Sequence, residues 1–321
     1  IIGTSIGAVI GGLYASGYSV DEIEDMVVNA DWEEILAISN FYNRDKMFID
    51  QKKYYDRKLI NLRFDNFKFQ MPQAISNGYR FSEFLEQKIL QSDYALESDF
   101  DKLKVPFRAM AMDIVTGKPY IFKSGDLLTA IRASTTVPLR FTPVVIDSMI
   151  LIDGGPVSNI PVLQAKEEFN PKTIIAVNTT SDIFTYKDLD NPINIADQVV
   201  SVLMLSNAEK ADEISDYVIK PNLKGVSNID FTNLRDIINK GEEATKKIDF
   251  SKLEKNENDN LNLKQPKKYI LNDLKINGNL NTGNDFILSE INLKAGDTIN
   301  PNDLFNLWQS LYSTELFSQV R

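Results

Sequence analysis

The chain has 321 residues, of which 43% are apolar and 25% charged, a composition typical of a soluble globular protein of about two domains. Its formal net charge of −10 disfavours nucleic acid as a partner, because an acidic surface repels phosphate. The sequence contains no cysteine and no histidine. These absences exclude disulfides, thiolate catalysis, Cys- or His-ligated metal sites and any Ser-His-Asp triad built from this chain alone.

The N-terminal residues predict a strand followed by two helices. Ile1 and Ile2 are typical of the end of a buried strand, and small residues from Ile6 to Ser16 predict a helix with Gly17 at its C-terminal cap. Ser19 to Glu22 matches a capping box, which opens the next helix.

Aromatic residues are concentrated between Phe41 and Phe84. Within this stretch, residues 62–64 and 67–69 alternate between apolar and polar, as expected of a hairpin of half-buried strands. The aromatic rings are consistent with a lipid-facing cover beside a site or with the core of an inserted hairpin, and we favour the core.

Apolar segments and helical periodicity then alternate along the chain. Residues 105–112, 146–152, 174–178 and 217–219 are expected to be strands, and residues 193–214 a helix. Strands that alternate with helices indicate βαβ units. We therefore expect an α/β fold with a mainly parallel sheet flanked by helices.

The composition changes near residue 250, where Lys, Glu, Asn, Asp and Gln become dense. We expect a large α/β domain over residues 1–250, a polar linker over 251–267 and a small α+β domain over 268–321. The chain opens at Ile1 without a Met and stops at Arg321 inside an expected strand, so we expect it to be a piece of a longer protein. No run approaches the ~18 apolar residues of a membrane helix.

Gly3-Thr4-Ser5-Ile6-Gly7 matches the pattern G-x-S-x-G of a nucleophile elbow. A serine at a sharp strand-to-helix turn has its hydroxyl exposed, and flanking glycines such as Gly3 and Gly7 remove side chains that would collide. The helix N-terminus that follows is suited to stabilising an oxyanion. The alternative is a glycine-rich turn that packs a helix on a sheet or binds phosphate.

A nucleophilic serine needs a base, and without histidine a carboxylate is the best candidate. Asp153 follows the apolar run Met149 to Ile152 and precedes Gly154 and Gly155. A carboxylate partly desolvated at a strand end has a raised pKa and is a better base. The alternative is an ordinary Asp-Gly turn in which the carboxylate caps its own backbone.

Read together, the Ser5 elbow and Asp153-Gly154-Gly155 resemble the patatin-like phospholipase family. Further similarity to the bacterial branch lies in residues 109–117 (D-x-x-T-G), 131–144 (R-A-S-x-x-x-P and F-x-P-V) and 153–162 (D-G-G-x-x-x-N-x-P-V). The resemblance covers most of residues 1–222. It implies a Ser-Asp dyad of Ser5 and Asp153, with Gly3, Gly7, Gly154 and Gly155 as supporting motif residues.

The resemblance also implies a glycine-rich oxyanion loop upstream of the elbow, and we expect that loop to precede Ile1. Arg132, Ser134 and Asn159 lie inside the matching segments. We expect them to close backbone hydrogen bonds around the Asp153 turn rather than to act in the reaction.

The C-terminal segment resembles a POTRA domain. The matching residues are 276–279 (I-x-G-N), 293–297 (L-x-x-G-D) and 311–317 (L-Y-x-x-x-L-F). Together the two resemblances imply an outer-membrane protein in which a membrane β-barrel follows in the same full-length chain, with the hydrolase on either side of the membrane.

The sequence thus predicts a lipid acyl hydrolase of the phospholipase A or esterase type that acts through an acyl-enzyme. Its expected partners are a phospholipid or another lipid ester as substrate and a membrane surface, with no metal or cofactor. The alternative is a patatin-fold passenger without catalysis, whose POTRA domain serves outer-membrane assembly or secretion.

Overall fold

The computed structural model describes most of the chain. The described residues are 1–36, 63–65, 68–70, 74, 76–180, 183–189, 192–226, 231–253, 268–279, 282–291, 293–312, 314, 316–317 and 320. Most of the aromatic stretch before residue 74 and most of the predicted linker lie outside them.

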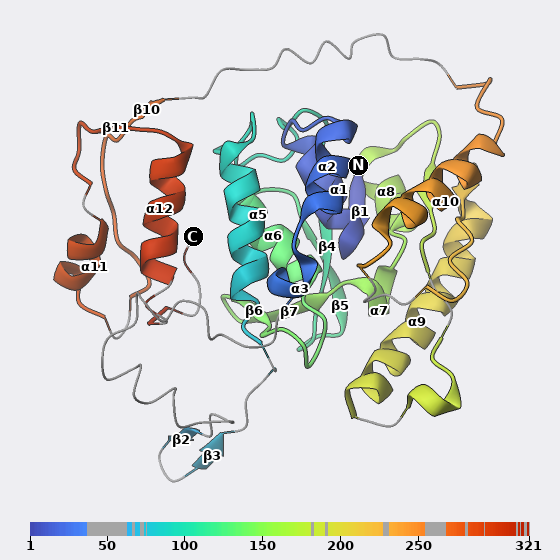
Figure 1. Ribbon diagram of the computed structural model, residues 1–321, viewed down its shortest axis with the longest axis horizontal. Coiled ribbons are helices and arrows are strands. Elements are labelled where there is room, and N and C mark those ends of the chain that lie inside the picture. The colour runs from blue at the N-terminus through green and yellow to red at the C-terminus, as the bar shows by residue number, and fades with distance from the viewer. Residues whose placement is uncertain are drawn as a thin grey trace.

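A five-stranded sheet forms the centre of the molecule (Figure 1). Its strands are β1 (Ile2–Thr4), β4 (Arg108–Asp113), β5 (Lys118–Phe122), β6 (Val144–Ile146) and β7 (Met149–Asp153). β5 pairs with β4 over residues 109–113 and so occupies one edge of that strand. β1 and β7 share the other edge end to end, since they pair with residues 108–110 and 111–113 respectively.

The prediction of a mainly parallel sheet is wrong. Only β1 runs parallel to β4 in this sheet, whereas β5 and β7 pair antiparallel with β4, and β6 with β7. The cause is that β4 to β5 and β6 to β7 are joined by tight turns, which connect antiparallel neighbours, instead of by helical crossovers. The fold is α/β with a mixed sheet.

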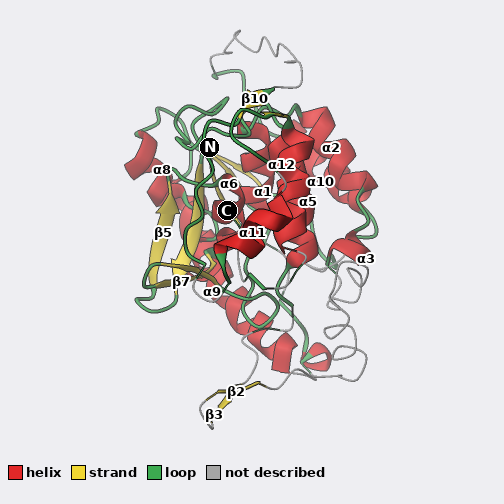
Figure 2. Cartoon of the chain, turned by 90° about the vertical axis from the view of Figure 1, so that its left-hand side faces the viewer, coloured by secondary structure: helices red, strands yellow, loops and turns green. Residues whose placement is uncertain are grey.

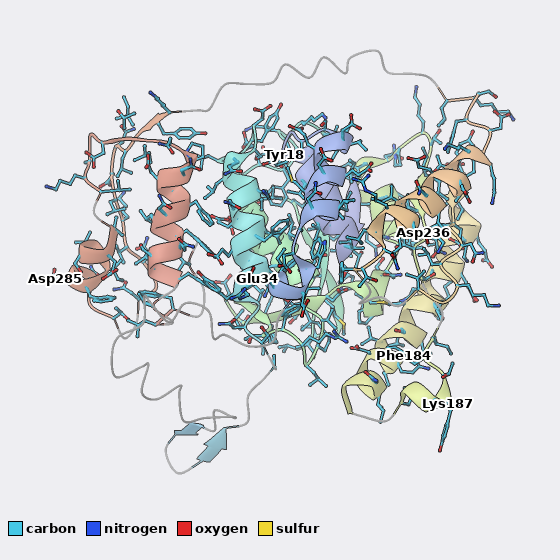
Figure 3. All side chains as sticks on the ribbon, in the orientation of Figure 1. Tyr18, Glu34, Phe184, Lys187, Asp236 and Asp285 are labelled. Atoms are coloured by element: carbon cyan, nitrogen blue, oxygen red, sulfur yellow. The ribbon has the colours of Figure 1, made fainter. Side chains whose placement is uncertain are left out.

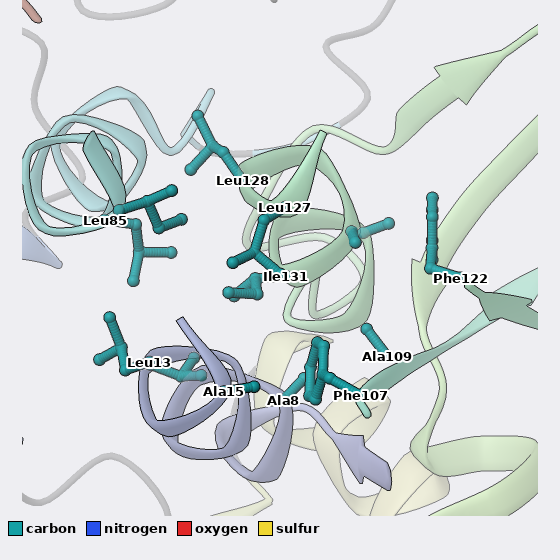
Figure 4. Packing of buried hydrophobic residues seen from close by; sticks show 14 of the residues in the cluster. Ala8, Leu13, Ala15, Leu85, Phe107, Ala109, Phe122, Leu127, Leu128 and Ile131 are labelled. Carbon is teal, nitrogen blue, oxygen red and sulfur yellow. The ribbon is translucent and has the colours of Figure 1, made fainter. Parts of the chain in front are cut away.

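Helices pack around this sheet and contribute most of the core. Figure 4 shows apolar side chains of α1, α5 and α6 meeting those of the sheet and of the residue directly before β4, among them Leu13, Leu85, Ile131 and Phe107. These four side chains are fully or almost fully buried. The helices of this region are α1 (Ile6–Ala15), α2 (Val20–Asn29), α3 (Trp32–Ile35), α5 (Tyr79–Gln91), α6 (Leu127–Ser134), α7 (Gly155–Ser158) and α8 (Val162–Phe169).

Local sequence signals at the helix ends are confirmed. The Ser19 side chain accepts a hydrogen bond from the Glu22 N–H while the Glu22 carboxylate accepts one from the Ser19 N–H, as a capping box requires. Gly17 follows α1 with a φ of 120°, a value suited to glycine. The predicted hairpin is present as β2 (Arg63–Asp65) paired antiparallel with β3 (Lys68–Gln70).

A parallel strand pair lies beside the main sheet. β8 (Ile175–Val177) and β9 (Tyr217–Ile219) are joined by the 3₁₀ turn η2 (Tyr186–Asp188) and the long helix α9 (Pro192–Ile214). This βαβ unit was predicted, but the expectation that β8 is buried holds for one face only. Ile175 and Val177 are about half exposed because the pair forms a separate two-stranded sheet. α10 (Leu234–Lys246) follows β9 and contacts it.

The C-terminal segment is a small α+β unit. β10 (Tyr269–Ile270) pairs antiparallel with β11 (Thr298–Ile299), accompanied by α11 (Asn284–Ile291) and α12 (Pro301–Tyr312). α12 lies along α5 (Figures 1 and 2). Between the two helices Trp308 is buried, and Tyr79 stacks on Tyr312 with 5.1 Å between ring centroids. Within the described residues, no helix combines the length and apolar character that a membrane crossing requires.

Candidate active site

Ser5 occupies a sharp turn between β1 and α1. Its backbone has φ 54° and ψ −123°, a strained conformation for any residue other than glycine. A Cβ on Gly3 would lie only 2.3 Å from the Gly7 carbonyl oxygen, so the turn requires glycine there. A Cβ on Gly7 would meet nothing within 4 Å. The expectation that both glycines prevent a collision is therefore confirmed for Gly3 and wrong for Gly7, which is exposed.

The elbow is held from α6. The Ser134 hydroxyl, which is fully buried, accepts a hydrogen bond of 3.0 Å from the Ser5 backbone N–H. Sequence reasoning placed Ser134 around the Asp153 turn, and the structure instead shows it bonded to the strained serine. The polar Ser134 within a buried segment was the available sequence signal for a structural role. Only the packing of α6 on α1 shows that its partner is the Ser5 N–H.

The sheet brings Ser5 and Asp153 together. β1 runs parallel to β4 and ends with Thr4 opposite Met110, while β7 runs antiparallel and ends with Asp153 opposite Ala111. The two strands share one edge of β4, so their C-terminal ends face each other at adjacent positions. Residues 148 positions apart in the sequence thus meet at the gap between two strands.

Asp153 has one satisfied and one unsatisfied oxygen. Its side chain is 1% exposed. Oδ1 accepts a hydrogen bond of 2.8 Å from the Gly155 N–H, which is the turn-capping bond of the alternative interpretation. Oδ2 is buried and has no hydrogen-bond partner among the described residues. One carboxylate therefore closes its own turn and still presents a free, desolvated oxygen.

Burial determines the acidity of Asp153. Removal from water raises the pKa of this carboxyl from 3.8 to about 6, against the smaller lowering effects of the Ser5 side chain and the Gly155 N–H. The Ser5 hydroxyl thus lies beside the carboxylate, without a hydrogen bond of regular geometry to Oδ2.

The two glycines after Asp153 allow the chain to pass close to its neighbours. A Cβ on Gly154 would lie 2.7 Å from the Met110 carbonyl oxygen of β4, which is backbone and cannot move away easily. A Cβ on Gly155 would lie 1.9 Å from the end of the Met204 side chain on α9. The close approach to backbone therefore requires glycine at position 154, whereas at position 155 the end of the flexible Met204 side chain would have to shift.

Arg132 does not support the Asp153 turn, so that expectation is wrong. Its guanidinium is buried between the rings of Phe81 and Phe141, at 5.7 and 5.3 Å from their centroids. Burial lowers its pKa. The side chain projects from α6 toward the start of α5, away from the end of β7, and its Nη2 donates to the Asn77 carbonyl oxygen at 3.4 Å.

The D-x-x-T-G segment is a structural turn. Asp113 at the end of β4 accepts hydrogen bonds from the Thr116 hydroxyl at 2.7 Å and from the N–H groups of Val115 and Ile150 at 3.2 Å each. These bonds lower the pKa of Asp113. Asp113 fastens the β4–β5 turn to the start of β7, the strand that carries Asp153.

The family model described as Patatin-like phospholipase matches residues 1–166, just over half of the chain. The chain belongs to the patatin-like phospholipase family. It is 26% identical over 205 residues, 64% of its length, to the lysophospholipase NTE1 of Debaryomyces hansenii. It is also 29% identical over 164 residues, half of its length, to an uncharacterised NTE family protein of Mycobacterium bovis. The matches cover 11% and 36% of these two relatives, so this chain spans only part of the length of either.

Proposed function

We propose that the protein is a lipid acyl hydrolase of the phospholipase A or esterase type, with Ser5 as nucleophile and Asp153 as general base. One observation carries the proposal: the strained Ser5 and the buried Asp153 with its free Oδ2 lie at facing strand ends. Membership in a phospholipase family supports a lipid ester as substrate.

Acylation begins when the Ser5 Oγ attacks the ester carbonyl carbon and its proton moves to Oδ2 of Asp153. The N–H groups of Ile6 and Gly7 at the start of α1 have no partner within the helix and favour the negative oxygen that develops. The tetrahedral intermediate then expels the alcohol, which takes the proton from Asp153. The products of this step are the free alcohol and an acyl-Ser5 ester.

Deacylation repeats these transfers with water. Asp153 takes a proton from water, and the oxygen attacks the acyl carbonyl carbon. Collapse of the second intermediate releases the fatty acid and returns the proton to Ser5. A base with a pKa of about 6 is mostly ionised at neutral pH and is still a better proton acceptor than an ordinary aspartate.

The test is hydrolysis of a fluorogenic phospholipid by the full-length protein beside Ser5→Ala and Asp153→Asn. We expect each variant to lose at least three orders of magnitude. Ser16→Ala is a matched control, because Ser16 is a buried serine bonded to the Leu13 carbonyl oxygen at the other end of α1. A fluorophosphonate, which reacts with activated serines, should add its mass to the peptide that contains Ser5.

Equal inertness of parent and variants toward phospholipids and simple esters, together with no labelling of Ser5, would contradict the catalytic proposal. The non-catalytic passenger would then be the better interpretation. Activity that survives in Asp153→Asn while Ser5→Ala is dead would instead keep the nucleophile and reject the base.

The identity of the C-terminal unit is a separate proposal. The motifs at residues 276–279 and 293–297 and the small α+β arrangement of β10, β11, α11 and α12 support a POTRA-like domain. Outer-membrane association and a barrel in the same full-length chain would follow from it. Fractionation of cells that express the full-length protein tests this placement.

A further inference from the structure

The outward face of α9 carries an apolar stripe that the fold does not use. Residues three and four apart share a helix face, and Ile195, Val199 and Val202 follow this spacing, with Leu203 beside them. Their side chains are 50%, 58%, 49% and 47% exposed. Single exposed aliphatic residues are ordinary, whereas four neighbours along two turns form a patch.

The same face changes character in the second half of the helix. Beyond Val202 and Leu203 the exposed residues are Ser206, Glu209, Lys210 and Glu213, the usual composition of a solvated surface. The opposite face provides the packing contacts, since Ala208 and Ala211 are buried there. Packing therefore does not explain the apolar residues of the first half.

Charge is nearly absent around the stripe. From Asn194 to Ser206 the only charged residue is Asp197, and Arg140 neutralises it through a contact of 2.7 Å between Nη2 and Oδ2. The chain's charge of −10 is thus carried elsewhere. The stripe on the helix thus presents no unpaired charge, whereas Lys187 and Asp188 lie in the loop before the helix. An apolar stripe of this kind on an acidic protein is suited to a neutral apolar surface.

The loop before α9 extends this face. The backbone N–H and carbonyl of Phe184 bond to the Gln198 side chain at 2.8 and 3.2 Å, which fixes the loop to the first half of the helix. Next to it, Ile183 is 44% exposed and Tyr186 94% exposed. Figure 3 shows Phe184 and Lys187 near the N-terminal end of α9. An exposed tyrosine and lysine beside aliphatic side chains are typical of a water–lipid boundary.

We define the α9 ridge as Ile183, Tyr186, Ile195, Val199, Val202 and Leu203. The inner face of the same helix forms part of the candidate site's wall. Met204 packs on Gly155, and the Asn207 amide donates to the Pro156 carbonyl oxygen at 3.0 Å, directly after Asp153. A helix is about 10 Å across, so a surface in contact with the ridge lies roughly that far from these residues.

We propose that the α9 ridge docks on the surface of a lipid bilayer and buries its apolar side chains at the boundary of head groups and acyl chains. The inference rests on the proposed lipid hydrolysis, because docking would hold the site next to its substrate. A second copy of the chain is a poorer fit. A few half-exposed side chains on one helix and its loop fall short of the roughly 800 Å² per partner that a stable protein interface buries.

The test compares vesicle binding of three proteins, all carrying Ser5→Ala so that no lipid is cleaved. The first has no other change, the second carries Val199→Ser and Val202→Ser, and the third carries Glu209→Ser and Glu213→Ser on the same face of the same helix. Binding is measured by sedimentation with phosphatidylcholine vesicles. Because these vesicles carry no net charge, the net charge of each variant has little influence on its binding. We expect the valine variant to partition about tenfold less and the glutamate variant to match the first protein.

Two further measurements separate the possible failures. With Ser5 intact, the valine variant should hydrolyse a soluble short-chain ester as fast as the parent, which also shows that it is folded. Hydrolysis by the parent without vesicle binding, or binding that is equal in all three proteins, would contradict membrane docking by the α9 ridge. Neither result would contradict catalysis by Ser5 and Asp153. Valine-dependent binding without any hydrolysis would keep the ridge and reject the proposed function. A dimer in sedimentation velocity that the valine substitutions dissociate would assign the face to self-association instead.

Discussion

Asp153→Asn should make the folded protein more stable, although we expect it to abolish the proposed activity. The wild-type carboxylate is 1% exposed, and its Oδ2 has no hydrogen-bond partner among the described residues. An asparagine of the same shape keeps the oxygen that accepts from the Gly155 N–H and carries no charge. The substitution therefore removes the cost of holding a charge out of water.

The size of this gain follows from the pKa. Burial raises it from 3.8 to about 6, and one pKa unit corresponds to about 1.4 kcal/mol. The difference of about two units sets an upper bound of about 3 kcal/mol on the gain above pH 7. Because the folded pKa is the higher one, the stability contribution of Asp153 is fully present below pH 4 and is lost as the pH rises through about 6. The gain in Asp153→Asn should therefore be small near pH 4 and largest above pH 7.

Chemical denaturation of both proteins between pH 4.5 and 8.5 measures this difference. Asp113→Asn is the matched control, because Asp113 is a buried carboxylate whose hydrogen bonds lower its pKa. That substitution should destabilise the protein, with the opposite sign. A gain in Asp153→Asn that does not vary with pH, or a loss at pH 8, would refute the desolvated base.

Three further comparisons test the same reasoning. Gly3→Ala should destabilise the protein by at least about 2 kcal/mol, because its Cβ would meet backbone. Gly7→Ala should change the unfolding free energy by less than about 1 kcal/mol. Equal losses of unfolding free energy in chemical denaturation would contradict this geometry. Ser5→Gly should be about 1 kcal/mol more stable than Ser5→Ala, because glycine tolerates φ 54°, and equal denaturation midpoints would argue against strain. Glu86 on α5 has a pKa raised to about 8 by burial and by the nearby Asp126. The full shift from 4.5 to about 8 would correspond to about 5 kcal/mol, but Glu86 is only partly buried and solvent screens its charge. The parent should therefore lose at least roughly 1 kcal/mol of stability between pH 5 and pH 9 that Glu86→Gln retains, and parallel pH profiles would show that Glu86 is solvated.

The local features of this protein follow from short stretches of sequence. The capping box at Ser19, the helix from Ile6 and the turn at Gly17 depend on neighbours within a few residues, and the structure confirms them. The helix predicted over residues 193–214 and the strand predicted over 217–219 are likewise present, as α9 and β9. Turn chemistry and spacing are properties of the local chain, so sequence alone is sufficient for them.

Strand direction in the sheet was not determined locally. The segments that form β4 and β7 read as strands in either orientation, and only their pairing shows that β7 runs against β4. The strand β5 was not predicted from the sequence. The roles of the residues around Ser5 were likewise not determined by the local sequence. Ser134 bonds to Ser5 across 129 residues, and Gly7 has open space where a collision was expected.

The sequence by itself determined which residues are candidates for the chemistry. The glycine-flanked Ser5, the absence of histidine and the resemblance of the Asp153 turn to the patatin-like family point to one serine and one carboxylate. The tertiary structure decided how they meet, because two strand ends converge only when both strands share one edge of β4. It also decided which oxygen is desolvated and which face of α9 remains exposed. Burial and exposure depend on what the rest of the chain packs against, and no local pattern contains that information.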